Sequence, residues 1–471
     1  MKSLFLLLGL AVTLPAKPNI LFIFADDQAH SSIAALGNEE IKTPNLDQLV
    51  QQGTSFTNAY NMGAWNGAVC IASRTMILSG RSLWHAEALD NPEGAKNLIE
   101  SGKTWPQLMK QAGYQTYFTG KWHAKAQPEK IFDEVRNKRP GMPNQTPAGY
   151  KRPLADGSDT WDPADPKFGG FWKGGKHWSE VVADDAELYF QEAAKKDEPF
   201  FFYLAFNAPH DPRQAPQEYL DKYPADKIKV PVNYQTEYPH MEAMKLKGKK
   251  DSLLRDENLA PLPRTELAVR VHRREYYALI THMDAQIGRI LKALDESGQR
   301  DNTIIIYSAD HGLACGEHGL LGKQNQYEHS VKPPLILVGP GIPANERRDA
   351  LVYLQDIVPT ALELAEMPKP DFVEFESLMP LAKEAGNASG RKAVLGSYIN
   401  CQRMIRVGDY KLIVYPATQT LRLFNLAKDP HEMNDLITQP EQKERAADLL
   451  KQLKALLKEH GDPLDLSGVE I

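Results

Sequence analysis

A cysteine and an arginine in one short segment are the residues of this chain with the clearest chemical potential. Cys70 and Arg74 lie within VCIASRTMILSGR, an apolar run at helical spacing that ends in Ser-Gly-Arg. If a helix begins here, the Cys70 thiol lies at its positive N-terminal end, and Arg74 follows one turn later on nearly the same face. The pair would present a nucleophile and fixed N–H donors to an anion. The alternative is a buried structural cysteine beside a surface arginine.

Apolar runs separated by helical stretches predict the elements that position these residues. The strand candidates are 19–25, 114–119, 200–206, 303–309 and 335–338. The clearest helix is expected over 273–294, with Gly298 beyond it as a stop signal. Continuous apolar strands alternating with helices are typical of an α/β protein whose mostly parallel sheet is covered on both faces.

Polar residues follow four of the predicted strands at the point where each strand ends. They are Asp26, Asp27, Lys121, His123, His210, Asp310 and His311. Each group alone is commonly a turn or a helix cap. In open α/β sheets, however, ligands bind outside the carboxyl ends of the strands, so these side chains are expected to share one site.

The residue types at this edge indicate the chemistry. Asp26, Asp27 and Asp310 offer hard oxygen ligands, which suit Ca²⁺ or Mg²⁺ better than zinc. The lysine and histidines, together with Arg74, supply positive charge and proton-transfer groups around an anion. A divalent cation surrounded by cationic side chains fits a tetrahedral oxyanion, either sulfate or phosphate.

The ordered motifs of the chain resemble those of the type I sulfatases in the alkaline phosphatase superfamily. The matching segments are KPNILFIFADDQ, CIASRTMILSGR, GKWHAK, NAPHDP, SADHGLACGEHGLLGK, YEHSVKPPLILVGPG, RMIRVGDYKLIVYP and LFNLAKDPHEMNDL. The resemblance implies an alkaline phosphatase-like α/β fold with a large, mostly parallel central sheet flanked by helices. It also implies a small C-terminal α+β subdomain built on a short antiparallel sheet.

The same resemblance assigns roles to individual residues. Cys70 matches the cysteine that a maturation enzyme oxidises to formylglycine, whose hydrate is the nucleophile. Modified Cys70 and Asp26, Asp27, Asp310 and His311 match the ligands of Ca²⁺, with Mg²⁺ as the alternative ion. The residues that match the sulfate-binding and proton-transfer groups are Arg74, Lys121, His123, His210 and Lys323.

Two residues differ from the most common family pattern. Ala72 stands where the family most often has proline, which leaves the maturation system open. His311 stands where many members have asparagine, and an imidazole nitrogen is a softer ligand than an amide oxygen. The Asp-His form of Asp310 and His311 is found in members that act on carbohydrates.

Three divisions of the 471-residue chain are expected. Residues 1–16 read as an export signal, because Lys2 precedes a short apolar run that ends in Pro-Ala. The catalytic α/β domain is expected over 17–385, and the C-terminal subdomain over 386–471. Its helix, at 439–460, carries a leucine stripe typical of core packing.

Composition excludes several classes of protein. A net charge of −6 argues against a nucleic-acid binder, and no apolar segment is long enough to span a membrane. The three cysteines do not form a disulfide framework, and spacing leaves Cys315 and Cys401 either free or paired. The export signal predicts that the mature protein is exported. The resemblance to the sulfatases implies a sulfated carbohydrate as substrate and the formylglycine-generating enzyme as a partner.

Substrate choice is expected to depend on two long insertions, 124–178 and 211–264, which alternatively serve only as solvated cover. The weaker candidates for sugar contacts are His318, Trp84, His85, His177 and Trp178. Three functions remain open from the residues: a carbohydrate sulfatase, a phosphate or phosphonate ester hydrolase of the same superfamily, and a non-catalytic binder of sulfated glycans in which Cys70 is never oxidised.

Overall fold

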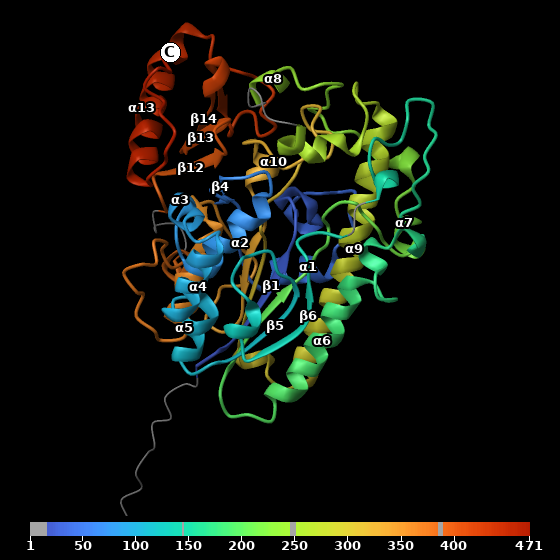
Figure 1. Cartoon of the computed structure of the whole chain (residues 1–471), viewed down its shortest axis with the longest axis vertical. Helices are drawn as coiled ribbons and strands as arrows, with labels where there is room; N and C mark the ends of the chain where they lie inside the picture. Colours follow the sequence, from blue (N-terminus) through green and yellow to red (C-terminus); the bar gives the residue numbers. More distant parts are fainter. Residues whose placement is uncertain (1–16, 144–145, 245–250, 385–389) are drawn as a thin grey trace, which may run out of the picture.

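The computed structural model describes residues 17–143, 146–244, 251–384 and 390–471, which form two large sheets, a short two-stranded sheet and the helices packed on them (Figure 1). The expected export signal and the expected boundary after residue 385 lie outside the described residues. Within the described ranges, no helix combines the length and apolar character needed to cross a bilayer.

The central sheet has eight strands in the order β10-β2-β9-β8-β1-β7-β5-β6. Their bounds are β1 Asn19–Ala25, β2 Thr54–Phe56, β5 Gln115–Lys121, β6 Glu134–Arg139, β7 Phe200–Ala205, β8 Thr303–Ala309, β9 Leu335–Val338 and β10 Glu346–Arg348. β1 lies in the middle, in parallel register with β7 and β8. The mostly parallel α/β sheet predicted from the sequence is confirmed.

Strand β9 is the exception to the parallel arrangement, since it pairs antiparallel with both β8 and β2. The prediction of Leu335–Val338 as one more parallel strand was therefore wrong. A parallel strand needs a crossover that carries the chain back to the opposite edge of the sheet. After β8 the chain instead stays beside the carboxyl edge, where Gly312 N donates to Ser330 O, so β9 starts from that edge.

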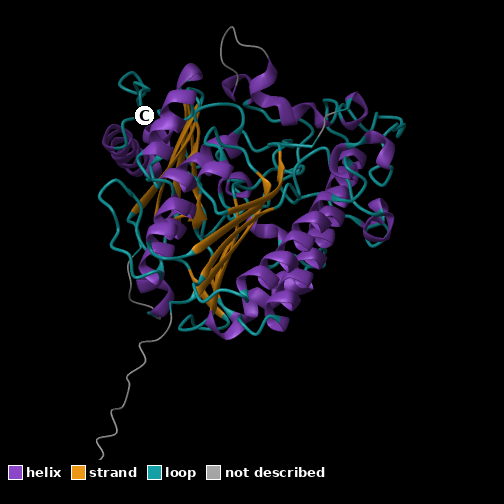
Figure 2. Cartoon of the chain, turned by 60° about the horizontal axis from the view of Figure 1, so that its bottom comes forward, coloured by secondary structure: helices purple, strands orange, loops and turns teal. Residues whose placement is uncertain are grey.

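Alternate residues of β1 face two separate cores. Leu21 and Ile23 pack in the core beneath α1, α6 and α9, whereas Ile20, Phe22 and Phe24 pack in the core beneath α2, α5 and α11. These helices are α1 Pro44–Gln52, α6 Trp178–Ala193, α9 Glu266–Glu296, α2 Val69–Ser79, α5 Trp105–Gln111 and α11 Ile357–Leu364. Figure 2 shows the strands enclosed by helices on both sides.

Helix α9 is longer than the helix expected over 273–294. It begins at Glu266, where the Thr265 side chain accepts a hydrogen bond from Ala268 N, and it ends at Glu296. The N-cap hydroxyl satisfies one of the free N–H groups of the first turn, which explains the earlier start. Short elements complete the two layers: α3 Leu83–Glu87, α4 Pro92–Glu100, α7 Gln217–Leu220, α8 Met241–Met244, α10 Glu328–Val331, α12 Met379–Lys383, β3 Ala59–Tyr60 and β11 Val352–Tyr353.

The C-terminal sheet is antiparallel, as expected, except for one strand from the N-terminal part of the chain. Its order is β15-β14-β13-β12-β4, and helix α13, Lys443–Glu459, packs on it with buried leucines (Figure 1, upper left). The strands are β4 Gly63–Ala64, β12 Ala393–Tyr398, β13 Gln402–Val407, β14 Tyr410–Tyr415 and β15 Thr420–Asn425. β4 pairs parallel with β12, and a Cβ at Gly63 would collide with the carbonyl group of Ser397.

A buried ion pair attaches the segment after α13 to this sheet. Arg403 Nε and Nη2 donate to the carboxylate of Asp462 at 2.6 and 2.8 Å, and neither side chain is exposed to solvent. We expect Asp462→Ala to lower the free energy of unfolding by about 3–5 kcal/mol, because it leaves a buried guanidinium without its counter-charge.

Urea denaturation monitored by circular dichroism measures this loss. Asp465→Ala is the matched control, since exposed Asp465 contacts only the nearby Ser467 in its hydrogen bonds. Equal unfolding free energies for the two variants would contradict a stabilising role of the Arg403–Asp462 pair.

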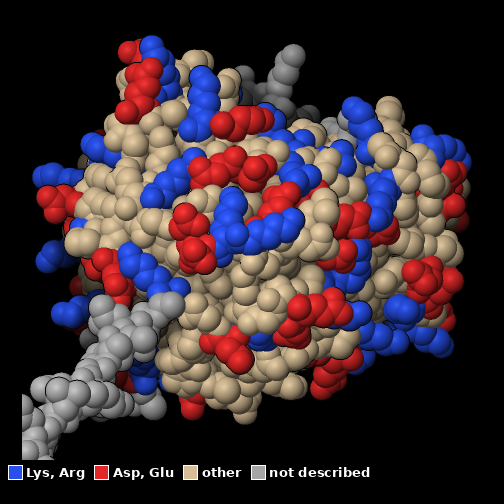
Figure 3. Space-filling view, turned by 90° about the horizontal axis from the view of Figure 1, so that it is seen from below, with Lys and Arg blue, Asp and Glu red and all other residues tan. Residues whose placement is uncertain are grey.

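On the face drawn in Figure 3, acidic and basic side chains are interspersed rather than segregated. Together with the net charge of −6, this distribution gives no extended basic band of the kind that follows a nucleic-acid backbone on this face.

Candidate functional site

The structure brings the polar residues at the ends of four strands into one buried site. Asp26 and Asp27 follow β1, Lys121 ends β5, His210 follows β7, and Asp310 follows β8. Asp26 N donates to Ala208 O, and Asp310 N donates to Ala25 O, so backbone bonds hold neighbouring strand ends together. The site occupies the carboxyl edge of the sheet, as the sequence predicted.

Helix α2 places Cys70 and Arg74 at this edge. Cys70 is the second residue of the helix and only 2% exposed. Ala68, the residue just before the helix, has no side chain that could cap the free N–H groups of the first turn. Gly80 ends the helix in the left-handed conformation, with its N–H bonded to Met76 O. Arg74 Nε donates to Asp310 Oδ2 at 3.1 Å, and its guanidinium lies over the Phe24 ring.

The surroundings of Cys70 favour a negative charge at its side chain. Sγ lies 3.1 Å from His123 Nδ1. Burial raises the pKa of the Cys70 thiol, but the nearby charges of Lys121, His123 and Lys323 outweigh burial and hold that pKa well below its ordinary value. An anionic oxygen carried by residue 70 would be stabilised by the same groups.

Three carboxylates and an imidazole form the acidic part of the site. Two sets of possible ligand atoms each lie within 4.8 Å of one another: Asp26, Cys70, Asp310 and His311; and Asp26, Asp27 and His210. Asp26 Oδ1 and His311 Nε2 are buried and have no hydrogen-bond partner in the described residues. Buried carboxylates this close require a counter-charge, so the donor set fits a divalent cation.

The pKa values of two of the carboxylates are shifted in opposite directions. Burial raises the pKa of Asp310, yet His311, Arg74 and Lys121 lower it far below its ordinary value. For Asp26, burial dominates over the contact with Lys121 and raises the pKa well above its ordinary value. A bound cation would favour the ionised form of both groups.

Lys323 and His210 both lie next to the Asp27 carboxylate. Lys323 Nζ is 2.8 Å from both carboxylate oxygens of Asp27 and 3.1 Å from His210 Nε2. Asp27 has a φ of 64°, and its backbone is held by Tyr276 OH donating to its carbonyl group. A non-glycine residue in this conformation persists only where its surroundings hold it, as at functional sites.

Comparison with known proteins identifies the family to which this site belongs. Residues 18–367 match the sulfatase family, and residues 316–459 match the C-terminal region of N-sulphoglucosamine sulphohydrolase. The chain belongs to the sulfatase family. It is accordingly a sulfuric ester hydrolase of the alkaline phosphatase superfamily, with the fold expected from the sequence.

Two related sulfatases and one solved structure align with nearly the whole chain. An arylsulfatase of Clostridium perfringens is 30% identical, and the alignment covers 94% of both proteins. An N-acetylglucosamine-6-O-sulfatase of Bacteroides thetaiotaomicron is 27% identical over 95% of this chain and 87% of the relative. A solved structure in complex with its substrate, D-glucosamine-2-N,6-O-disulfate, is 25% identical, has a TM-score of 0.72 and covers 95% of this chain and 99% of that one.

His177 and Trp178 occupy the core of this sulfatase, which does not fit the expectation that they contact a sugar. His177 is fully buried, stacks on Phe171, and accepts a hydrogen bond from Ser179 N at the start of α6. Trp178 is 2% exposed, and its indole N–H donates to Lys173 O. The aromatic and basic residues near them in the sequence belong to the part of the insertion that packs at the start of α6.

The other three sugar candidates also lie in packing or pairing contacts. Trp84 is 9% exposed and lies beneath the guanidinium of Arg403. His85 is more exposed but pairs with Glu374 at 2.7 Å. His318 is 3% exposed, and its ring stacks on Tyr327 at a centroid distance of 4.1 Å. None of the three has a side-chain contact with the site residues among those described.

All three cysteines are buried, and none forms a disulfide bond. The question that spacing left open for Cys315 and Cys401 is thereby answered. Burial raises the pKa of the Cys315 thiol to about 11, the opposite direction from Cys70. The two thiols differ because Cys70 has three cationic neighbours close enough to outweigh burial.

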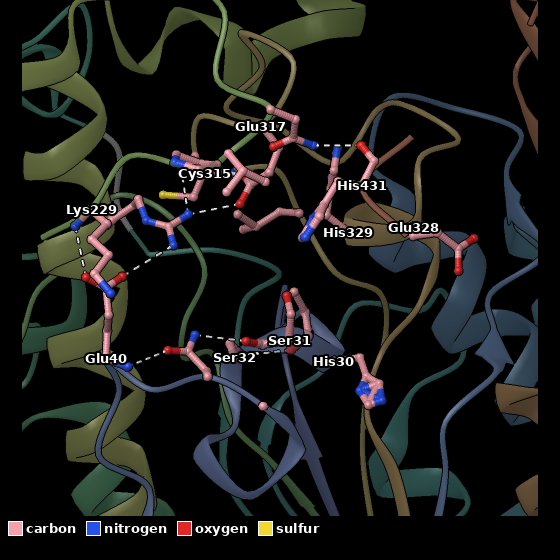
Figure 4. A pocket seen from close by; sticks show the side chains of 18 of the residues that line it. His30, Ser31, Ser32, Glu40, Lys229, Cys315, Glu317, Glu328, His329 and His431 are labelled. Atoms are coloured by element: carbon pink, nitrogen blue, oxygen red, sulfur yellow. Dashed lines mark hydrogen bonds and ion pairs between the residues drawn. The ribbon is translucent and has the colours of Figure 1, made fainter. Parts of the chain in front are cut away.

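A separate pocket of about 510 Å³ is lined in part by the segment 313–317 (Figure 4). Cys315, Glu317 and His329 line one part of it, and Ser31 and Ser32 another. Its charged groups are largely paired within the sulfatase, since Arg273 contacts both Glu317 and Glu40. The pocket is distinct from the buried cluster around Cys70.

The motifs missed three charged residues that border the buried cluster around Cys70: Asp211, Arg255 and Asp256. Arg255 Nη2 lies 3.0 Å from Asp211 Oδ1, and the guanidinium also pairs with Asp256. Asp211 stands next to His210 in NAPHDP, so a sequence signal existed for it. Arg255 comes from the second insertion, 44 residues further on, and no local pattern marked it.

Proposed function

We propose that this sulfatase hydrolyses O-sulfate esters on a sulfated polysaccharide or its oligosaccharide fragments. Support comes from the convergence of three carboxylates, two lysines, an arginine and three histidines around Cys70. It also comes from the similarity to an N-acetylglucosamine-6-O-sulfatase and to a structure bound to a sulfated glucosamine. The cluster carries the proposal, because its charges complement one tetrahedral oxyanion next to one nucleophile.

In this proposal Cys70 is converted to formylglycine by a maturation enzyme, and one hydroxyl of its hydrate attacks sulfur. Asp26, Asp27, Asp310 and His311 would hold Ca²⁺ or Mg²⁺ beside residue 70. The ion would neutralise charge on the sulfate oxygens and on the attacking oxygen. Asp26 Oδ1 and His311 Nε2 are buried without a hydrogen bond among the described residues, which supports this assignment.

The remaining side chains are assigned by their contacts. Lys121 and Arg74 neutralise charge on the sulfate oxygens as the bond to the leaving group breaks. His123, 3.1 Å from Cys70 Sγ, removes the proton of the second hydroxyl so that sulfate leaves and the aldehyde returns. His210, with Lys323 3.1 Å from its Nε2, protonates the departing sugar oxygen, which leaves as an alcohol.

Residues 1–16 are proposed to direct export of the protein, so that it meets its polysaccharide outside the cytoplasm. The partner implied by Cys70 is the formylglycine-generating enzyme of the native host.

Mass spectrometry of the Cys70 peptide from the native host tests the nucleophile. We expect the mass of formylglycine, in which the thiol sulfur has been replaced by an aldehyde oxygen. Peptides that contain Cys315 and Cys401 serve as internal controls and should keep their thiols. An unmodified Cys70 in an otherwise intact native protein would overturn the catalytic proposal and favour a glycan-binding role.

Release of inorganic sulfate and inorganic phosphate from matched esters tests the reaction. With Ca²⁺ present, we expect sulfate release to exceed phosphate release from aryl esters of the same phenol. A panel of sulfated glycans then identifies the sugar. Phosphate release clearly faster than sulfate release would instead assign the protein to the phosphate or phosphonate ester hydrolases.

A further inference from the structure

Asp211, the residue that follows the proposed acid His210, contacts the His210 imidazole at two points. Asp211 O accepts a hydrogen bond from His210 Nδ1 at 2.6 Å, and Asp211 Oδ1 lies 3.3 Å from the same nitrogen. Both side chains are almost completely buried. A carbonyl oxygen can only accept, so Nδ1 carries a proton and Nε2 faces the site, where Lys323 and Asp27 lie.

Asp211 is itself held by groups from the two long insertions. Tyr150 OH donates to Asp211 Oδ2 at 3.2 Å, and Arg255 Nη2 donates to Asp211 Oδ1 at 3.0 Å. The side chain therefore has both oxygens occupied and one rotamer available. An orienting partner that is itself fixed in this way is what keeps an imidazole in a single tautomer and direction.

Arg255 extends this arrangement to Lys323. Arg255 Nε donates to Asp256 Oδ1 at 2.8 Å, and Asp256 Oδ2 accepts from Gln324 Nε2 at 3.0 Å. Gln324 directly follows Lys323 in the chain. The Arg255 guanidinium thus contacts both Asp211, which holds His210, and Asp256, which lies beside the Lys323 segment. The Arg255 side chain is 25% exposed, whereas that of Asp211 is 2% exposed.

We propose that Asp211, held by Arg255 and Tyr150, is a positioning residue that directs the proton on His210 Nε2 toward the leaving oxygen. This proton transfer suits the enzyme to sulfate esters of sugars, whose alcohols are poor leaving groups. This inference rests on the proposed sulfatase reaction. In that step a new S–O bond forms to the oxygen at residue 70 as the bond from sulfur to the sugar oxygen breaks. The electron pair stays on the sugar oxygen, which takes the Nε2 proton and leaves as an alcohol.

Asp211→Asn tests the proposal, because it preserves shape and the backbone carbonyl while removing the charge. We expect kcat for a sugar sulfate to fall by about 10- to 100-fold, the range for orienting partners. For an aryl sulfate with an acidic phenol, kcat should change far less, because that leaving group departs without a proton. The readout is the dependence of kcat on leaving-group pKa across a series of aryl sulfates. This dependence should be steeper for Asp211→Asn than for the wild-type protein.

Asp221→Asn is the matched control, since Asp221 lies exposed after α7 in the same insertion and contacts Gln217. Tyr150→Phe removes one hydrogen bond to Asp211 and should shift the leaving-group dependence in the same direction if Asp211→Asn fails to fold. Thermal unfolding identifies that failure. An equal loss of kcat on all esters, or no loss on the sugar sulfate, would overturn the inference. A wild-type protein inactive on every sulfate ester would overturn the proposed function instead.

Discussion

Cys70→Ala is expected to lower kcat for sulfate release by about 10⁴-fold or more, the scale seen when a covalent nucleophile is removed. The variant loses the atom that would attack sulfur, while Lys121, Arg74 and the carboxylates remain in place. Substrate binding should therefore survive the loss of turnover. Initial rates of sulfate release and calorimetric titration with the same glycan separate the two effects.

Cys315→Ala is the matched control for this variant. It removes a second buried thiol that has no contact with the Cys70 cluster, and it should retain normal kcat. A Cys70→Ala protein that keeps more than a tenth of wild-type kcat would contradict a nucleophilic role for residue 70. Loss of kcat in the Cys315 variant would show that the effect comes from general loosening of the core.

Asp310→Asn is expected to lower kcat by about 10³-fold, since a bound cation contributes several kcal/mol to stabilising the transition state. Asp310 is well placed to hold an ion, because it is fully buried, charged neighbours hold its pKa far below its ordinary value, and it lies with Asp26, Cys70 and His311 in one possible ligand set. Dialysis of the wild-type protein against a chelator should produce a similar loss, and added Ca²⁺ should restore activity.

Thermal unfolding gives a readout that does not depend on turnover. Ca²⁺ at about 100 times its dissociation constant should stabilise the wild-type protein by about 2.7 kcal/mol and leave Asp310→Asn almost unchanged. Asp301→Asn, an exposed position just before β8, is the control and should respond like the wild type. Equal Ca²⁺ responses of all three proteins would place the ion elsewhere.

Much of the site could be predicted because its signals are local. Asp26 and Asp310 each follow a continuous apolar run, Lys121 stands at the end of another predicted strand, and parallel strands bring such ends to one edge. Cys70 and Arg74 belong to one short helix, whose periodicity fixes their relative direction. These relations need only neighbouring residues and the general geometry of a parallel sheet.

Features that depend on distant partners could not be predicted in the same way. The direction of β9 is set by the route of the preceding segment, not by its four apolar residues. His177 has the composition of a ligand-binding loop, but Phe171 and the backbone of Gln214 make it part of the core. Arg255 gains its position from Asp211, a contact that its own segment does not encode.

The pairing of β4 with β12 joins the C-terminal sheet to the chain segment that leads into α2. Gly63 and Ala64 lie just before the helix that carries Cys70, and their partner strand begins at Ala393. Gln402, on the next strand, donates through Nε2 to Gln324 O at 3.0 Å, beside Lys323. A chain truncated before β12 would lose both a neighbour of the Cys70 segment and a support of Lys323, and the two sheets are expected to melt in one cooperative transition.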